Sequence, residues 1–240
     1  MDELELLQKR CRELALRAEH RGTVCCTEFL TLAEQDAARR AGARVFSGGY
    51  AGAERRMAVF GGEEADAALC CLRVAPKQPK FAEKLTHRDL LGSLMALGLR
   101  RSVFGDLVEG ENGVWRLFCL PEQADYVVEN WTEARHTAIT VAPQEGAVAE
   151  LAPPEPTEVV IPSVRLDALV AAVWRLSRSE SQALLAQGLV FVNGKAIASP
   201  GFEPREGDAV TVRGTGRFSY EGVARETKKG RLRALVRIYR

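Results

Sequence analysis

The chain has 240 residues, of which 46% are hydrophobic, and its formal net charge is +1. This length suits one large domain or two to three small ones, and the ordinary apolar content excludes a wholly disordered chain. No run of about 20 apolar residues is present, so we expect no membrane-spanning helix. The acidic N-terminus MDELELLQKR is unlike a secretion signal, which predicts a cytoplasmic protein.

The small net charge conceals an uneven distribution along the chain. Residues 1–159 contain 19 Lys and Arg against 25 Asp and Glu, a net charge of −6. Residues 160–240 contain 14 against 7, a net charge of +7. Such a division is typical of a protein with a nucleic-acid-binding end, although a solvated basic tail would give the same count.

Two helices are predicted at the start of the chain. Residues 2–19 have leucines spaced among charged residues, as in an amphipathic helix. Thr27 precedes a second apolar pattern, at positions 29, 30, 32, 33 and 37, that predicts a helix ending near Gly42. Residues 1–43 are therefore expected to form a small helical N-terminal region.

Residues 44–142 change to a pattern of strands with two helices. Strands are predicted in ARVFSGG, RRMAVFGG, DAALCCLRVAP, SVFGDLVEG, GVWRLFCL and RHTAITVA. One helix is expected after Thr86, which has the spacing of a capping box with Asp89, and a second begins at Pro121. This order predicts an α+β sandwich in which two helices cover one face of a sheet.

Residues 143–159 contain four prolines and are interpreted as a linker to a compact unit over 160–240. That unit is expected to begin with a helix in VRLDALVAAVWRL. A second helix follows, capped by Ser177 with Glu180 in the capping-box position. Asn193-Gly194 predicts a hairpin turn, and strands are expected in REGDAVTVRG, FSYEGVA and RALVRIY.

The sequence has no recognisable catalytic or metal-binding constellation. The six cysteines lack the paired spacing of a zinc site and are interpreted as reduced packing residues. HRD at 87–89 lacks the downstream Asn of a kinase catalytic loop. Asp167 is followed by a plain apolar helix and is interpreted as a structural carboxylate near the helix start. We expect no enzyme activity, no cofactor and no bound metal.

Basic and polar side chains are frequent in the C-terminal unit. Arg178 and Gln182 are four residues apart and share one helix face, and an exposed Arg and Gln beside a helix N-terminus can hold phosphates and base edges. The alternative is that these arginines only keep a face of the sheet in contact with solvent and bind no RNA. The predicted RNA-binding set is Arg165, Ser177, Arg178, Ser181, Gln182, Lys195, Arg213, Arg217, Lys228, Lys229 and Arg231, with the aromatic residues Phe218, Tyr220 and Tyr239 among them.

Several of these motifs resemble a known family. RLDALVAAVWRLSRSESQALLAQGLVFVNGKAI, followed by REGDAVTV, resembles the S4 (S-four) domain, an RNA-binding module named for a ribosomal protein. The remaining chain is similar to the YlmH-type family of S4-domain RNA-binding proteins. The similar motifs are TEFLTLAEQ, VFSGGYAGAERR, KFAEKLTHRDLLGSLMALGLRR, FGDLV and TGRFSY with ETKKGR, which together extend the resemblance over about residues 25–240.

The resemblance implies a helical N-terminal piece (1–43), a central fold like an RNA-recognition motif (44–142), a linker (143–159) and a C-terminal S4 domain (160–240). The aromatic consensus string with which RNA-recognition motifs stack bases is absent. A second candidate RNA surface is therefore expected at other residues of the central domain, with capping or ion-pairing roles as the alternative. These residues are Arg55, Arg56, His87, Arg88, Arg100 and Arg101.

The resemblance also implies a function and partners. Members of the family associate with ribosomal RNA of the large ribosomal subunit carrying stranded peptidyl-tRNA, and assist the rescue of stalled translation. We therefore expect ribosomal RNA, the large subunit and tRNA as partners of a monomer in the cytoplasm, or in the plastid stroma of a photosynthetic eukaryote. Two alternatives stay open: an RNA-modifying enzyme targeted by its S4 domain, and a protein-interaction factor in cell division or photosystem assembly.

Overall fold

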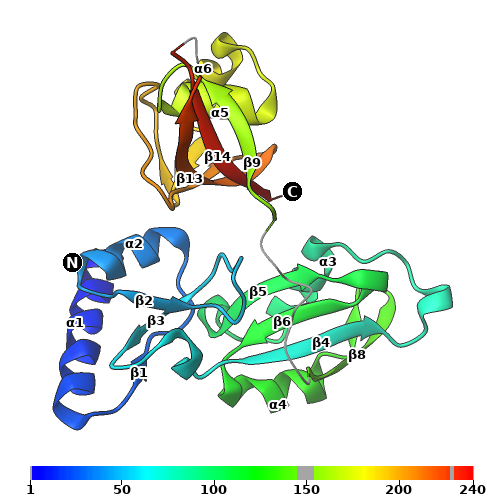
Figure 1. Cartoon of the computed structure of the whole chain (residues 1–240). Helices are drawn as coiled ribbons and strands as arrows, with labels where there is room; N and C mark the ends of the chain where they lie inside the picture. The colour runs from blue at the N-terminus through cyan, green and yellow to red at the C-terminus, as the bar shows by residue number, and fades with distance from the viewer. Residues whose placement is uncertain (1, 145–153, 228–229, 240) are drawn as a thin grey trace. The chain divides into compact units, whose positions relative to one another are not determined.

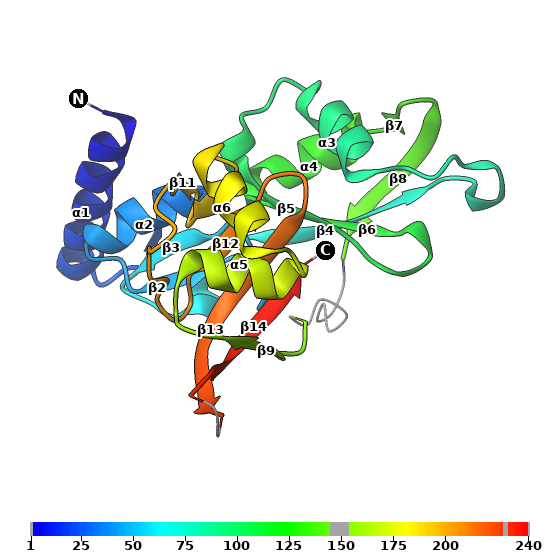
Figure 2. The ribbon, with the colours of Figure 1, turned by 90° about the horizontal axis from the view of Figure 1, so that it is seen from above.

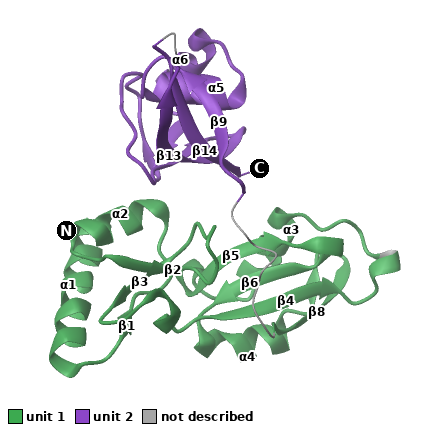
Figure 3. Cartoon of the chain, in the orientation of Figure 1, with its two compact units in different colours: residues 1–152 green, residues 153–240 purple. Residues whose placement is uncertain are grey.

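The computed structural model describes residues 2–144, 154–227 and 230–239, and the chain separates into two compact units (Figure 1, Figure 3). Unit 1 spans Met1–Ala152 and unit 2 spans Pro153–Arg240. Most of the expected linker, residues 145–153, lies outside the described residues. Each unit has an apolar core of its own, as expected for parts that fold around separate centres.

The first part of unit 1 consists of two helices packed on a small antiparallel sheet. The helices are α1 (Glu3–Arg21) and α2 (Leu32–Arg40), and the sheet has the order β1 (Cys25–Cys26), β3 (Met57–Phe60), β2 (Val45–Ser47). Residues 45–60 therefore pair with the N-terminal region, whereas the sequence groups them with the central sandwich. The reason is that all four residues of β3 are buried, so the strand needs apolar layers on both faces.

Helix α2 begins later than the sequence suggests. Its N-cap is Thr31, whose main-chain N–H donates to Glu34 Oε2 (2.6 Å) while its hydroxyl accepts from the Glu34 N–H (3.4 Å). Thr27, the expected start, is buried, and its hydroxyl accepts a hydrogen bond from the main-chain N–H of Ala58 (2.9 Å). Both threonines suit an N-cap by residue type, and only Thr31 has the glutamate three positions later.

The central part of unit 1 is a five-stranded antiparallel sheet. Its strand order is β5-β6-β4-β8-β7, with the bounds β4 (Cys70–Pro76), β5 (Phe104–Glu109), β6 (Trp115–Cys119), β7 (Glu133–Ala134) and β8 (Thr137–Pro143). Helices α3 (His87–Met95) and α4 (Pro121–Asn130) complete a β-α-β-β-α-β order. Figure 2 shows both helices on the same side of this sheet, and side chains of both belong to one core. The Trp131 indole N–H, just after α4, donates to Ser93 Oγ of α3 (2.9 Å). The predicted α+β sandwich is confirmed.

Helix starts in this part match the sequence signals. Thr86 caps α3 in a complete capping box with Asp89, and Pro121 occupies the first turn of α4. Short 3₁₀ segments connect the elements of unit 1, at η1 (Glu64–Asp66), η2 (Pro79–Phe81), η3 (Arg101–Val103) and η4 (Glu111–Gly113).

The face of the central sheet opposite the helices is partly covered by the glycine-rich loop at 48–54. Phe118 of β6 is 1% exposed and packs with Phe29 and Met57. The ring of Tyr50 stacks on Phe118, with 5.1 Å between centroids. A Cβ atom on Gly49 would lie 2.5 Å from the Phe118 ring, so glycine is required for this approach. The Phe118 ring is therefore used in packing and is closed to a stacked base.

Unit 2 is a six-stranded antiparallel sheet with two helices on one face (Figure 1). The strand order is β11-β10-β12-β13-β14-β9. The bounds are β9 (Thr157–Ile161), α5 (Leu166–Trp174), α6 (Arg178–Ala186), β10 (Val190–Val192), β11 (Lys195–Ala196), β12 (Ala209–Val212), β13 (Gly216–Glu226) and β14 (Leu232–Tyr239). Residues 157–159, which the sequence assigns to the linker, are the start of edge strand β9. The prolines before this strand are typical of a linker, and its pairing partner β14 lies 71 to 79 positions later in the chain. The strand is therefore not recognisable from the local sequence.

The cysteines are free thiols in this structure. Cys70 and Cys119 are directly opposite each other on β4 and β6, with 3.3 Å between their sulfur atoms. The hydrogen bond with Cys119 lowers the pKa of the Cys70 thiol, and the same contact together with burial raises the pKa of Cys119. In the part of the chain that is described, no helix has the length and apolar character needed to cross a bilayer.

Candidate nucleic-acid interface

The two helices of unit 2 are joined by a tight connection that fixes the start of α6. Arg175 ends α5 in the left-handed conformation (φ 54°), and the main-chain N–H of Leu176 returns to the carbonyl of Ala171 (2.9 Å). Ser177 then caps α6, and its N–H donates to the Glu180 carboxylate (2.7 Å). This connection places Arg178 in the first turn of α6.

Asp167, in the first turn of α5, is the centre of a polar cluster made with Arg165, Arg178 and Gln182. Its carboxylate is buried and accepts two hydrogen bonds from Arg165, at 3.0 Å from Nε and 3.1 Å from Nη2. It also accepts from the Gln182 side-chain amide (2.9 Å) and from Arg178 Nε (3.4 Å). One buried carboxylate thus holds three of the side chains that the sequence assigns to RNA binding.

The electrostatics of this Asp167 cluster keep the carboxylate ionised. Burial acts to raise the pKa of Asp167, but the hydrogen bonds from Arg165 and Gln182 and the charges of both arginines outweigh it, so the pKa is lowered. The same hydrogen bond raises the pKa of Arg165. The Arg178 side chain is 70% exposed although its Nε faces Asp167, so most of its guanidinium remains open to a phosphate.

Asp167 itself is absent from the predicted RNA-binding set. The sequence identifies it only as a carboxylate at a helix start, and the structure adds that it orients its neighbours. The signal available in the sequence is the R-x-D spacing of Arg165 and Asp167 together with the R-x-x-x-Q spacing of Arg178 and Gln182. What the sequence does not reveal is that α5 and α6 bring these two patterns together.

Lys195 lies exposed on the short strand β11, beside the predicted hairpin turn. Asn193 and Gly194 both have positive φ, as the tight turn requires. The Asn193 side chain fixes this turn to the neighbouring one, because its amide donates to Asp208 (2.8 Å) and its carbonyl accepts from the Ala209 N–H (3.0 Å). Lys195 is therefore presented from a rigid hairpin.

Two further arginines of the predicted set lie over aromatic rings. The guanidinium carbon of Arg213 is 5.0 Å from the centre of the Phe191 ring, and that of Arg217 is 4.3 Å from the centre of the Tyr239 ring. Phe218 and Tyr220, which the sequence places among the arginines as RNA-surface aromatics, are instead buried in the core of unit 2. Alternation along β13 explains the difference, because successive side chains point to opposite faces.

The remaining members of the predicted RNA-binding set differ in exposure. Ser181 is fully buried and its hydroxyl donates to the carbonyl of Arg178 (3.0 Å), so the expectation that it faces RNA does not fit its position. Ser177 is exposed, with its hydroxyl engaged in the cap of α6. Arg231 is exposed at the end of the β13–β14 connection, whereas Lys228 and Lys229 lie outside the described residues.

The candidate surface in unit 1 has a different character, because its central arginines bind main-chain carbonyls. Arg55 donates to the carbonyls of Phe104 (3.0 Å) and Phe29 (2.9 Å). Arg101 donates to those of Phe104 (2.7 Å) and Gly105 (3.0 Å). Burial, followed by the charge of Arg55, lowers the pKa of Arg101 to about 10. These two side chains tie the glycine-rich loop and η3 to β5.

Among the other members of that candidate surface, Arg100, His87 and Arg88 are exposed and Arg56 is half-buried. Arg100 forms an ion pair with Glu28 (2.7 Å), and Arg56 Nε donates to the Ala53 carbonyl (2.7 Å). His87 and Arg88 lie in the first turn of α3. Partial burial and the charge of Arg101 lower the pKa of His87. The structure therefore divides the six residues into three half-buried arginines that donate to main-chain carbonyls (Arg55, Arg56 and Arg101) and three exposed residues (His87, Arg88 and Arg100).

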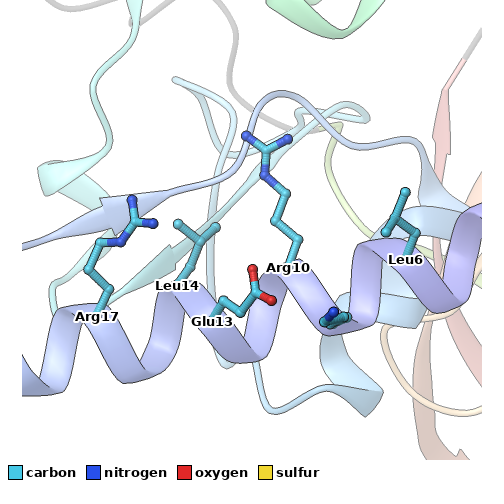
Figure 4. A pocket seen from close by; sticks show the side chains of 6 residues that line it. Leu6, Arg10, Glu13, Leu14 and Arg17 are labelled. Carbon is cyan, nitrogen blue, oxygen red and sulfur yellow. The ribbon is translucent and has the colours of Figure 1, made fainter.

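Surface hollows lie elsewhere in unit 1. One lies along α1, where Figure 4 shows Arg10 and Arg17 extending from the helix beside Leu14. Another is lined by Lys77, Gln78, Ala82, His136, Thr137 and Ala138. Neither contains a residue of the two candidate RNA surfaces. Among the described residues, no three His, Cys, Asp or Glu side chains are grouped to hold a metal ion.

Comparison with known proteins gives matches to both units. Residues 63–147 match the model of the putative RNA-binding domain in YlmH, and residues 164–210 match the S4 domain. The chain is 36% identical, over 200 residues, to the ribosome-associated protein quality control protein P2 of Bacillus subtilis strain 168, covering 78% of this chain and 75% of that protein. A solved structure of the cell division protein ylmH from Streptococcus pneumoniae has a TM-score of 0.46 and 17% identity, covering 60% of this chain and 93% of that one.

Proposed function

This chain belongs to the YlmH-type family of S4-domain RNA-binding proteins, and from that premise we propose that it acts as a ribosome-associated RNA-binding adaptor. The observation that supports this most is the Asp167 cluster. A buried carboxylate orients Arg165 and Gln182 together with Arg178, whose side chain is 70% exposed on the first turn of α6. Guanidinium and amide groups at a helix N-terminus suit the recognition of phosphates and base edges.

We propose ribosomal RNA of the large subunit as the target, on particles that carry stalled peptidyl-tRNA. The name of the Bacillus subtilis relative, a ribosome-associated quality control protein, supports this assignment. The chain would act as a cytoplasmic monomer in translation rescue. It would bind and orient RNA, and Asp167, whose oxygens are engaged by Arg165, Arg178 and Gln182, would position these side chains.

Replacement of Arg178 by glutamate tests this function. Arg178→Glu reverses a charge at the most exposed member of the Asp167 cluster, where it would repel phosphate. We expect the variant to leave the large-subunit fractions of a sucrose gradient in which the wild-type protein sediments with the particles. The measurement is the share of protein in each fraction, detected by immunoblot at fixed salt.

Arg205→Glu is the matched control for the sedimentation experiment. Arg205 is also exposed in unit 2, and its side chain is outside the predicted RNA-binding set. The same change of charge at Arg205 should leave most of the protein with the particles. Equal sedimentation of the Arg178→Glu variant and the wild type would show that the Asp167 cluster does not bind the protein to the large subunit.

A further inference from the structure

One row of side chains crosses the outer face of the sheet in unit 2. The registers of four neighbouring strands place Phe191 (β10) opposite Thr211 (β12), Thr211 opposite Arg217 (β13), and Arg217 opposite Tyr239 (β14). Residues directly opposite in antiparallel strands point to the same face. Their chain neighbours Val190, Val212, Phe218 and Ile238 belong to the core on the helix side of the sheet, so the row lies on the side away from α5 and α6.

The row contains two arginine–aromatic stacks. Arg217 lies over Tyr239 at 4.3 Å, and Arg213, which directly follows β12, lies over Phe191 at 5.0 Å. All four members of the row are half-buried, and Arg213 is exposed. A guanidinium that lies over a ring can stack on it and present its other surface to a further planar group.

The charge on this face is suited to a polyanion. Arg237, one row further along β14, adds a third arginine to Arg213 and Arg217. It forms an ion pair with Glu221 (3.3 Å). The face therefore combines planar groups with positive charge. This is the combination with which proteins hold single-stranded nucleic acid, because bases stack on the planes while the backbone follows the charge.

We propose that this face, the stacking row of Phe191, Thr211, Arg217 and Tyr239 with Arg213, binds unpaired RNA bases by stacking. The inference rests on the proposed RNA-binding function and adds a second contact of a different kind from the Asp167 cluster. Three of the four residues in the row lie beyond residues 164–210, the segment that matches the S4 domain. Four strands spaced by about 4.8 Å are wide enough for two or three bases, as in other sheet platforms.

The experiment compares two RNA probes at the same salt concentration, using the full chain. One is an unstructured ten-nucleotide RNA that contains 2-aminopurine, whose fluorescence falls when it stacks. The other is a blunt RNA duplex, whose bases are already stacked on each other. Arg217→Lys keeps the charge and removes the plane, and Tyr239→Leu removes the ring under it.

We expect each variant to bind the single-stranded probe about tenfold more weakly, to lose the 2-aminopurine quenching, and to bind the duplex within about twofold of the wild type. The salt dependence of binding should be unchanged for Arg217→Lys, because the charge is retained. Arg225→Lys, at the far end of β13, is the matched control and should bind both probes like the wild type. Tyr239→Phe should also retain the quenching.

Two outcomes would overturn the stacking row. Equal losses on both probes for Arg217→Lys would make Arg217 a general backbone contact. Wild-type binding and quenching in both Arg217→Lys and Tyr239→Leu would remove the row from the interface. If Tyr239→Leu fails to fold, the binding and quenching of Arg217→Lys alone test the stacking row. A wild-type protein that binds neither probe would instead contradict the proposed RNA-binding function itself.

Discussion

The two units use arginine in opposite ways. In unit 1, Arg55 and Arg101 direct their donors at main-chain carbonyls of their own domain, and burial lowers the pKa of both. In unit 2, Arg165 and Arg178 meet a buried carboxylate, and the Arg178 side chain stays 70% exposed. The first arrangement uses guanidinium groups to hold a loop. The second fixes their direction and keeps them available to a ligand.

This difference shows that a count of basic residues does not separate arginines engaged in packing from arginines exposed to a ligand. Both units have arginines near helix starts and glycine-rich turns, and the sequence assigns both groups to RNA. What separates them is the acceptor that each guanidinium meets inside the protein. Carbonyls of β5 and its neighbours engage donors of Arg55, whereas Asp167 engages only the Nε edge of Arg178.

The largest expected effect is that a substitution in unit 2 reduces RNA binding, whereas a substitution in unit 1 reduces stability. Arg178→Ala should weaken RNA binding about tenfold or more, since a charge-assisted hydrogen bond contributes about 1.5 to 3 kcal/mol, and should leave stability nearly unchanged. Arg55→Ala should lower the free energy of unfolding of unit 1 by about 2 kcal/mol and leave RNA affinity within about twofold. The measurements are fluorescence anisotropy with labelled RNA and urea unfolding.

Fluorine NMR of 5-fluorotryptophan separates the two units during unfolding. Trp115 and Trp131 report on unit 1, and Trp174 is the tryptophan of unit 2. Arg205→Ala serves as the control for the loss of one exposed charge. A loss of RNA affinity by Arg55→Ala, with unit 1 as stable as in the wild type, would contradict the proposed packing role of Arg55.

A second effect is a pH dependence specific to unit 2. The folded-state pKa of Asp167 is below its unfolded value, which is near 4. Its contribution to stability is therefore complete above that unfolded value and is lost as the pH falls through the folded-state pKa. Asp167→Asn should be less stable than the wild type at neutral pH, and the difference should shrink in acid below about pH 4.

The fluorine signal from Trp174 in urea titrations at several pH values measures this difference. The same titrations give unit 1 as the internal control, because Asp167 is in the other unit. A gap between Asp167→Asn and the wild type that stays constant down to strongly acidic pH would mean that the charge of Asp167 does not stabilise unit 2.

The smallest expected effect is at the hairpin. Lys195 is exposed and would contribute one phosphate contact, so Lys195→Ala should weaken RNA binding only about two- to threefold. The salt slope of log K should fall by about 0.7 to 0.9, which is the change expected for a single phosphate. A titration over several salt concentrations measures both. An unchanged slope would place Lys195 outside the RNA surface.

The helix signals of the fold could be predicted well from the sequence. The capping boxes at Thr86 and Ser177, Pro121 in the first turn of α4, and the Asn193-Gly194 turn act within a few residues, so local chemistry decides them. The strands β1 and β9 could not be predicted. They are short or follow prolines, and their partners β3 and β14 lie far along the chain.

The candidate site shows the same division between local and distant information. Residue type and helix spacing predict Arg165, Arg178 and Gln182 as RNA-binding residues, and the structure shows that all three meet at Asp167. The role of Asp167 required the packing of α5 against α6, and the burial of Ser181 required knowing which face of α6 points inward. Phe191 and Tyr239 join one row only through the registers of three strand pairs.

The RNA affinity of Asp167→Asn, measured with the full chain at fixed salt, is the most direct test of whether Asp167 orients an RNA-binding surface. The substitution removes one negative charge from the RNA-binding unit, so charge alone predicts tighter binding. If Asp167 orients Arg165, Arg178 and Gln182, binding should instead weaken about tenfold. Glu226→Gln, the same change of charge at an exposed site on β13, should tighten binding slightly. Equal or tighter binding by a folded Asp167→Asn variant would show that Asp167 does not orient an RNA-binding surface.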